Sequence, residues 1–252
     1  MRVICIGSGN VATHMTVALK TAGAHIDQIW SRNIKHAAAL ANVVGARPVS
    51  DLSEVGISAD LLVIAVKDDA IAEVCSALKG VQALVVHTSG ATGIDVLSSF
   101  ENYGVLYPLQ TFSKSRPIDF NKVPMFVEAN NRIALDELKI IASRLSHLIY
   151  DATSDQRKTL HLSAVFACNF VNHLYALGNQ LLQDNGLDFE MLRPLILETA
   201  EKVQHDLPLN VQTGPAVRDD RQTILKHLEL LEGKPHLQEI YQTLSKSIKK
   251  NR

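Results

Sequence analysis

The segment Gly7-Ser8-Gly9-Asn10-Val11-Ala12 has the residue types and the G-x-G-x-x-A spacing of a dinucleotide-binding loop. An apolar run, Val3–Ile6, precedes it and a helical pattern, Val11–Thr21, follows it. In a strand–turn–helix, the first glycine permits a tight turn and the second lets the backbone approach a pyrophosphate. The alanine permits close packing of helix on strand. The segment therefore predicts a dinucleotide site, with an ordinary strand–turn–helix as the alternative.

The residues after the second predicted strand, Ile26–Trp30, bear on which dinucleotide binds. A site for NAD usually carries Asp or Glu here, which accepts hydrogen bonds from the ribose 2′-OH. Asp27 lies too early, because the strand continues to Trp30. Ser31 and Arg32 offer a hydroxyl and a guanidinium, which suit a 2′-phosphate. The pattern predicts NADP rather than NAD, and it counts against S-adenosylmethionine.

The third predicted strand, Leu61–Val66, runs into Lys67, Asp68 and Asp69. Ligands bind beyond the carboxyl ends of parallel strands. We therefore expect Ala65, Val66 and Lys67 to face the nicotinamide ribose. Asp68 and Asp69 are expected to cap the helix that begins at Ala70.

Polar residues follow the next two strands as well. His87 could donate a proton or a hydrogen bond to a carbonyl or imine, or it could be a satisfied histidine at a strand end. Thr88 and Ser89 could bind a substrate carboxylate, or they could form a turn and a helix cap. Gly90 completes this group, and the segment Tyr107–Phe112 is either a pocket wall or a structural turn.

One face of a long predicted helix is unusually polar. Lys158, His161, Val165, Asn169 and Asn172 are spaced so that they fall within an arc of about 80° on an α-helix. Polar groups that are buried without partners cost free energy, so this stripe is not typical of a core. It is expected to face a cleft, with a hydrogen-bonded subunit interface as the alternative.

The elements that position these residues alternate between strand and helix up to about residue 153. The predicted strands are Val3–Ile6, Ile26–Trp30, Leu61–Val66, Ala83–His87, Val105–Tyr107, Met125–Glu128 and His147–Tyr150. The predicted helices between them are Val11–Thr21, Lys35–Ala41, Ala70–Leu78, Gly93–Phe100 and Ile133–Ser146. Helices then follow alone, at Asp155–Asn185, Asp188–His205, Ala216–Glu232 and Pro235–Lys249.

This order predicts an α/β fold, a Rossmann-type doubly wound and mostly parallel sheet followed by an all-α domain. We expect a dinucleotide-binding Rossmann domain over residues 1–153. Residues 154–252 are expected to form a helical domain that shapes the substrate site and dimerises.

Composition narrows the class of protein further. The chain has 252 residues, of which 46% are hydrophobic and 20% charged, and its net charge is −1. These values predict a globular protein without nucleic-acid or membrane partners, and no apolar run approaches the ~18 residues of a membrane span. Cys5, Cys75 and Cys168 lie in apolar runs without metal-ligand spacing. They predict buried thiols, no metal site and a cytoplasmic location.

The chain resembles a family of Rossmann-like proteins whose C-terminal helical half is a domain of uncharacterised function and whose members are usually described as NADP-dependent oxidoreductases. The segments that carry the resemblance are Gly7–Ala12, Ile64–Ile71, His87–Ala91, Tyr107–Phe112, His161–Asn169 and Thr213–Asp220. More distantly, the chain is similar to pyrroline-5-carboxylate reductases and β-hydroxyacid dehydrogenases, whose helical halves often interlock in a dimer. The latter use Ser-Gly-Gly and a Lys with Asn four residues on. Here Ala91 follows Ser89-Gly90, and Leu162 stands four residues after Lys158, so the catalytic lysine of that family does not carry over.

Together these features predict an NADP-dependent reductase or dehydrogenase that acts on a small carbonyl, imine or hydroxy compound. The expected polar participants are His87, Ser89, Lys158, His161 and Asn169, and a homodimer through the helical domain is expected. The alternatives are a non-catalytic NADP sensor and a nucleotide-binding fold that uses another ligand.

Overall fold

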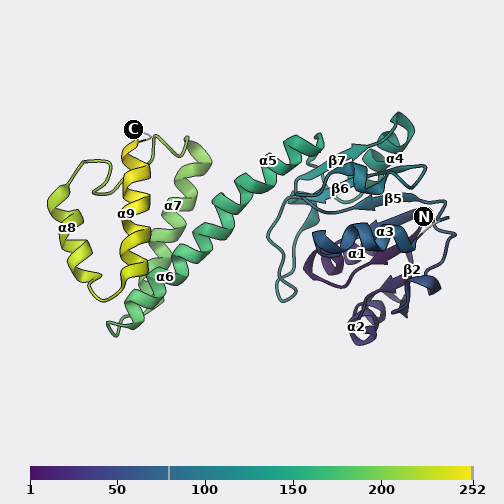
Figure 1. Cartoon of the computed structure of the whole chain (residues 1–252), viewed down its shortest axis with the longest axis horizontal. Coiled ribbons are helices and arrows are strands. Elements are labelled where there is room, and N and C mark those ends of the chain that lie inside the picture. The colour runs from purple at the N-terminus through teal and green to yellow at the C-terminus, as the bar shows by residue number, and fades with distance from the viewer. Residues whose placement is uncertain (79, 251–252) are drawn as a thin grey trace. The chain divides into compact units, whose positions relative to one another are not determined.

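The computed structural model describes residues 1–78 and 80–250, which divide into two compact units (Figure 1). The first unit is Met1–Asn169, and the second begins at Phe170. The first unit contains the sheet and the loops that follow its strands. The second contains helices.

The sheet of the first unit has eight strands in the order β3-β2-β1-β4-β5-β6-β7-β8. Neighbouring strands run parallel, except that β6 and β7 are antiparallel. The order reverses between β1 and β4, where open α/β sheets bind their ligands. The strands are β1 (Arg2–Ile6), β2 (His25–Trp30), β3 (Arg47–Val49), β4 (Leu61–Ile64), β5 (Leu84–His87), β6 (Tyr103–Pro108), β7 (Met125–Ala129) and β8 (Ile149–Asp151).

Helices cover both faces of this sheet, which confirms the predicted α/β fold. Successive side chains of a strand point to opposite faces. Val3 and Cys5 of β1 therefore pack with α1 (Asn10–Thr21), α2 (Ile34–Val44) and α4 (Arg132–Ser143). Ile4 and Ile6 pack with α3 (Ile71–Ala77) on the other face.

Two local predictions were wrong. Strand β3 was missed because it is short and contains Pro48, which cannot donate to a ladder and is tolerated at a sheet edge. The predicted helix Gly93–Phe100 is a single 3₁₀ turn, Ile94–Leu97. Side chains instead bind the backbone that precedes this turn: Ser89 Oγ accepts from two N–H groups, and Arg157 donates to the Thr92 carbonyl.

Helical residues run without a break from Ser154 to Gln183. They comprise α5 (Ser154–Ala164), a π-helical segment (Val165–Phe170) and α6 (Val171–Gln183). Among the described residues, this one stretch is long and apolar enough to cross a membrane, since an 18-residue window of it has a mean hydropathy of 1.2. The sequence analysis predicted no membrane span. One such helix is weak evidence for a membrane span, although none of its apolar window is buried within the described chain.

The remaining helices of the second unit are α7 (Arg193–His205), α8 (Arg221–Leu230) and α9 (Pro235–Lys250). In the portion of this unit that the structure describes, three hydrophobic side chains are buried, those of Ala216, Leu231 and Leu237. Large apolar residues on its helices remain exposed, among them Leu195, Leu197, Leu225 and Leu230. Amphipathic helices normally bury one apolar face, so this unit leaves much of its apolar surface uncovered.

Candidate functional site

A cleft of about 510 Å³ lies over the turn between β1 and α1. Ala12, the last residue of the predicted motif, is buried beneath this turn, at 2% exposure. The other predicted cofactor residues all line the cleft: Gly7, Ser8, Gly9, Asn10, Val11, Ser31, Arg32, Ala65, Val66 and Lys67. The structure thus brings the predicted cofactor-binding residues together around one cleft.

Gly7 and Gly9 have different structural roles. Gly7 has φ +129°, and a Cβ there would lie 2.2 Å from the Ala65 carbonyl oxygen. A Cβ on Gly9 would meet no atom within 4 Å, so the backbone there faces open space. This arrangement fits a pyrophosphate above Gly9, at the N-terminus of α1.

The far end of the cleft carries basic and hydroxyl groups. Ser8 Oγ donates a hydrogen bond to Ser31 Oγ at 2.9 Å, and Arg32 and His36 line the rim. No Asp or Glu of the described chain lines this cleft. Asp27, the one acid near this point in the sequence, pairs with Arg2 at 2.6 Å. The positive charge at this end of the cleft suits a phosphate. His36, which lines the cleft here, was not predicted from the sequence.

A second pocket, of about 290 Å³, adjoins the cleft and shares Val11 and Val66 with it. Its wall includes the segment Tyr107–Phe112, together with His161 and Asn169 from the long helical stretch. The side-chain amide of Asn10 in the glycine loop donates to the Phe112 carbonyl at 2.9 Å. The two cavities are therefore neighbours within the first unit, and a hydrogen bond links their walls.

Tyr107 and His161 form the central polar pair of this pocket. Tyr107 Oη lies 3.0 Å from His161 Nδ1, and the two rings meet edge to face. Burial, together with the negative charge of Asp68, raises the pKa of Tyr107 to about 12. The phenol therefore keeps its proton at neutral pH. Tyr107 was named in the sequence only as part of a pocket wall.

The His161 ring packs directly on the loop that follows β5. A Cβ on Gly90 would lie 2.7 Å from His161 Cγ and Nδ1, so glycine is required by this close approach. The π-helical segment begins four residues after His161, and it places Cys168 and Asn169 on the same pocket wall. π-Helical turns are rare and often occur at functional sites.

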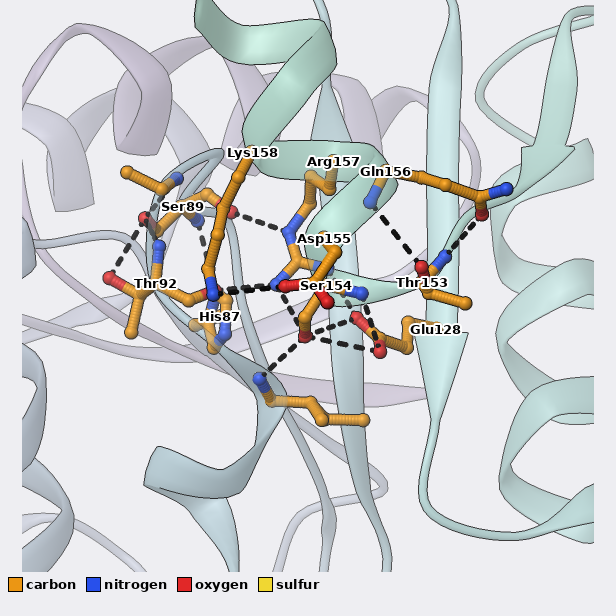
Figure 2. Close-up of polar contacts among 12 residues, drawn as sticks. His87, Ser89, Thr92, Glu128, Thr153, Ser154, Asp155, Gln156, Arg157 and Lys158 are labelled. Atoms are coloured by element: carbon orange, nitrogen blue, oxygen red, sulfur yellow. Dashed lines mark hydrogen bonds and ion pairs between the residues drawn. The ribbon is translucent and has the colours of Figure 1, made fainter.

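A buried arginine fixes this loop against α5 (Figure 2). Arg157, with a side chain 1% exposed, forms an ion pair with Glu128 of β7. Its guanidinium also donates to the carbonyls of Ser89, at 3.1 Å, and Thr92. Ser154 donates to Glu128 through its backbone N–H, at 2.8 Å, and through its hydroxyl. Arg157 and Glu128 were not predicted, because nothing in the sequence marks an arginine in a polar first helical turn as buried.

Two of the predicted polar participants, His87 and Lys158, do not line the pocket, and a third, Ser89, lines it but bonds within its own turn. His87 is fully buried, and its Nδ1 accepts from the Ser89 N–H at 3.1 Å. Ser89 Oγ accepts from the N–H groups of Ala91 and Thr92, so it serves the turn, as the structural alternative predicted. Lys158 does not line the pocket, and its ammonium pairs with Asp155 at 3.3 Å.

Two expectations about single side chains need correction. Asp68 and Asp69 do not cap the following helix, because they lie inside a 3₁₀ turn that has no side-chain cap. Asp68 instead lines the second pocket. Cys5 and Cys75 are buried as expected, but Cys168 is exposed and lines the pocket, on a stretch where residues 166–170 are all exposed.

Comparison with known proteins places this arrangement in a family. A model described as a Rossmann-like domain matches residues 1–112, and a model described as a domain of unknown function, DUF2520, matches residues 123–248. The chain belongs to the DUF2520 family. The pocket joins both matched regions, since Tyr107 lies in the Rossmann-like domain and His161 in the DUF2520 domain. No curated protein matches the chain.

Solved structures resemble the chain over nearly its whole length. A Bacteroides fragilis protein named "putative NADP oxidoreductase" is 44% identical, with 99% of this chain and 98% of that chain covered and a TM-score of 0.94. An imine reductase from Myxococcus stipitatus in complex with NADP+ is 13% identical (99% and 93% covered, TM-score 0.70). A pyrroline-5-carboxylate reductase from Coxiella burnetii is 18% identical (98% and 97% covered, TM-score 0.59). The last two share the fold.

The two glycines of the loop predict opposite behaviour on substitution. Gly7→Ala should destabilise the protein by roughly 2–4 kcal/mol, because the new Cβ meets the Ala65 carbonyl at a positive φ. Gly9→Ala should leave stability within about 0.5 kcal/mol of the native value. It should nevertheless weaken dinucleotide binding, because its Cβ fills the space above the helix N-terminus. Urea unfolding and cofactor titration measure the two effects, and equal stability of both variants would contradict this account.

His87 predicts a loss of stability in acid. Burial, and then the charge of Arg157, lower its pKa to about 4. The unfolded chain, with a pKa near 6.5, binds the proton more readily. Stability from neutral His87 is therefore present above pH 6.5 and is lost as pH falls toward 4, by about 3 kcal/mol. His87→Asn, which keeps an acceptor for Ser89 N–H, should flatten the pH dependence of urea unfolding, whereas exposed His25→Gln should not.

Proposed function

We propose that the chain is an NADP-dependent oxidoreductase that reduces a C=O or C=N group of a small molecule, or catalyses the reverse oxidation. The observation that carries the proposal is the contact between two cavities, since Val11 and Val66 line both the dinucleotide cleft and the Tyr107–His161 pocket. A dinucleotide held over the glycine loop would have its nicotinamide end at this junction.

The cofactor assignment rests on the cleft and on its relatives. Gly7, Gly9 and the N-terminus of α1 suit a pyrophosphate, and Ser31, Arg32 and His36 suit a 2′-phosphate. The B. fragilis relative carries NADP in its name, and the M. stipitatus reductase is in complex with NADP+. When bound, the nicotinamide supplies or accepts a hydride at a carbon of the substrate.

The protein would supply orientation and a proton. With a pKa of about 12, Tyr107 remains a donor at neutral pH. In the tautomer that carries a proton on Nδ1, His161 donates to Tyr107 Oη, and the phenol hydrogen is left to point into the pocket. A substrate oxygen or neutral imine nitrogen beside Tyr107 would then receive that proton. Asn169 lines the same wall and would contribute an amide hydrogen bond.

The preference for NADP predicts that replacing Arg32 weakens the binding of NADP but not of NAD. Native protein should bind NADP more tightly than NAD, and Arg32→Ala should weaken NADP binding about 10- to 100-fold because a charge-assisted phosphate contact is removed. NAD binding should not change. Arg47→Ala, which removes the same charge where Arg47 pairs with Glu54 at 3.2 Å, is the matched control. Equal affinity of the native protein for NAD and NADP in calorimetric titration would contradict the assignment.

The proton-donor role predicts an effect on turnover. With a carbonyl or a neutral imine as substrate, Tyr107→Phe should lower kcat for NADPH oxidation by about 100-fold, with a smaller change in KM, because the phenol acts mainly in the transition state. Tyr150→Phe removes a hydroxyl from a half-exposed ring and should have no effect. The assay uses a panel of aldehydes, ketones and imines. Tight NADP binding without turnover on the panel would favour the sensor function.

We also propose that the helical unit pairs with the same unit of a second copy. Its three buried hydrophobic residues, as far as the structure describes them, cannot balance the entropy of ordering four helices. Exposed Leu195, Leu197 and Leu230 offer apolar area for a homodimer. Analytical ultracentrifugation should give twice the chain mass at micromolar concentration, and a monomer at every concentration would exclude the pairing.

The proposed location is the cytoplasm. Cys5, Cys75 and Cys168 are free, and burial raises the pKa of the Cys5 and Cys75 thiols to about 12 and 11. Such thiols suit a reducing compartment, where cysteines remain unpaired.

A further inference from the structure

We infer that the Tyr107–His161 pocket selects a substrate whose reacting nitrogen is cationic in the oxidised form, an iminium ion that is reduced to a neutral amine or formed from one, with the Asp68 carboxylate as the counter-ion of the iminium. This inference rests on the proposed function, and it names the substrate class of the same pocket. It also excludes substrates that the pocket would have to bind through a carboxylate group of their own.

The charged side chain that lines the pocket is negative, and no positive one balances it in the lining. Among its lining residues in the described chain, Asp68 is the one Asp or Glu, and there is no Lys or Arg. The remaining polar lining groups are hydroxyls, amides, backbone groups, Cys168 and the His161 ring. The neighbouring Lys67 lines the dinucleotide cleft instead. A bound anion would therefore meet a like charge at the pocket wall, whereas a bound cation would meet its opposite. The charge of Arg157 also reaches Tyr107, but Arg157 does not line the pocket and is paired with Glu128.

Asp68 is available for a ligand. It lies in the 3₁₀ turn Asp68–Ala70, where its side chain makes no capping bond. Its carboxylate forms no hydrogen bond or ion pair with any residue that the structure describes. Its charge nevertheless reaches the reaction pair, since it contributes to the raised pKa of Tyr107. An exposed carboxylate at a pocket wall, beside a neutral phenol, is a suitable partner for an ammonium or iminium group.

The Ser89 groups and the nearby guanidinium that could hold a carboxylate are already occupied. The Ser89 N–H donates to His87, and Ser89 Oγ accepts from Ala91 and Thr92. The one buried guanidinium near the loop, that of Arg157, is paired with Glu128 and with two carbonyls. Ser89 therefore does not contribute to the carboxylate site that the sequence suggested, and the Thr88 N–H is likewise occupied, by the Ile64 carbonyl at 3.1 Å.

The chemistry of an iminium balances without a proton donor. Its carbon accepts a hydride, the C=N π electrons move to nitrogen, and a neutral amine forms while the reduced nicotinamide becomes the oxidised cation. The positive charge would thus pass from the substrate to the cofactor at the junction of the two cavities, with Asp68 on the wall of the substrate pocket. A carbonyl substrate requires a proton from Tyr107 in addition.

The test compares ligands of one shape and three charges. Protein saturated with NADPH, whose nicotinamide is neutral as it is when an iminium binds, is titrated calorimetrically with cyclohexylamine, cyclohexanol and cyclohexanecarboxylate at pH 7.5. The ammonium should bind at least about 10-fold more tightly than the alcohol, and the carboxylate should bind least tightly. Asp68→Asn should remove the preference for the ammonium. Asp69→Asn, a neighbour that does not line the pocket, should preserve it.

Turnover provides a second readout. Asp68→Asn should lower kcat/KM for 1-pyrroline about 10-fold and leave that for cyclopentanone unchanged. Tighter binding of the carboxylate than of the ammonium, or equal loss for both substrates, would overturn the inference. An Asp68→Asn variant that loses NADP affinity but keeps the ammonium preference would overturn it too, because Asp68 would then be a cofactor contact. NADP affinity of the native protein is measured separately. If the native protein does not bind NADP, the proposed function itself has failed, and not only this inference.

Discussion

The buried ion pair of Arg157 and Glu128 is the interaction on which the candidate site depends. It joins the start of α5 to β7 and fixes the two carbonyls that bracket the loop after β5. Gly90 of that loop supports the His161 ring, and His161 contacts Tyr107. Removing one partner would leave an uncompensated buried charge, which costs about 3–5 kcal/mol. The pair therefore sets the geometry of the pocket without touching its ligand.

The adjacency of the two cavities follows from the topology of the sheet. The strand order reverses between β1 and β4, so the loops after these strands diverge and leave a crevice. Val11 follows β1 and Val66 follows β4, and both line each cavity. The cofactor cleft and the reaction pocket are thus two ends of one crevice. Among the described residues that line this crevice, Asp68 supplies the one carboxylate.

The sequence predicted the features that depend on local patterns. The glycine loop, the alternating elements and the hydroxyl–guanidinium pair Ser31–Arg32 all have short-range signals, and the structure brings them together. It could not predict contacts made across the fold. Arg157 and Glu128 are far apart in the chain, and Asp68 reads locally as a helix cap. The polar stripe was expected to bring His161 and Asn169 to one cleft, and both line the pocket, but the sequence carries no signal for the π-helical segment that holds Asn169 and Cys168.

The central claim is that the nicotinamide end of the cofactor lies at the junction of the two cavities. A crystal structure of the protein with NADP+ bound measures this most directly. The account predicts the nicotinamide C4 atom beside Val66, facing Tyr107 and His161, with space for a substrate atom within the ~3–3.5 Å needed for reaction. A nicotinamide that points away from Tyr107, with the adenosine at the Val11–Val66 junction, would contradict it.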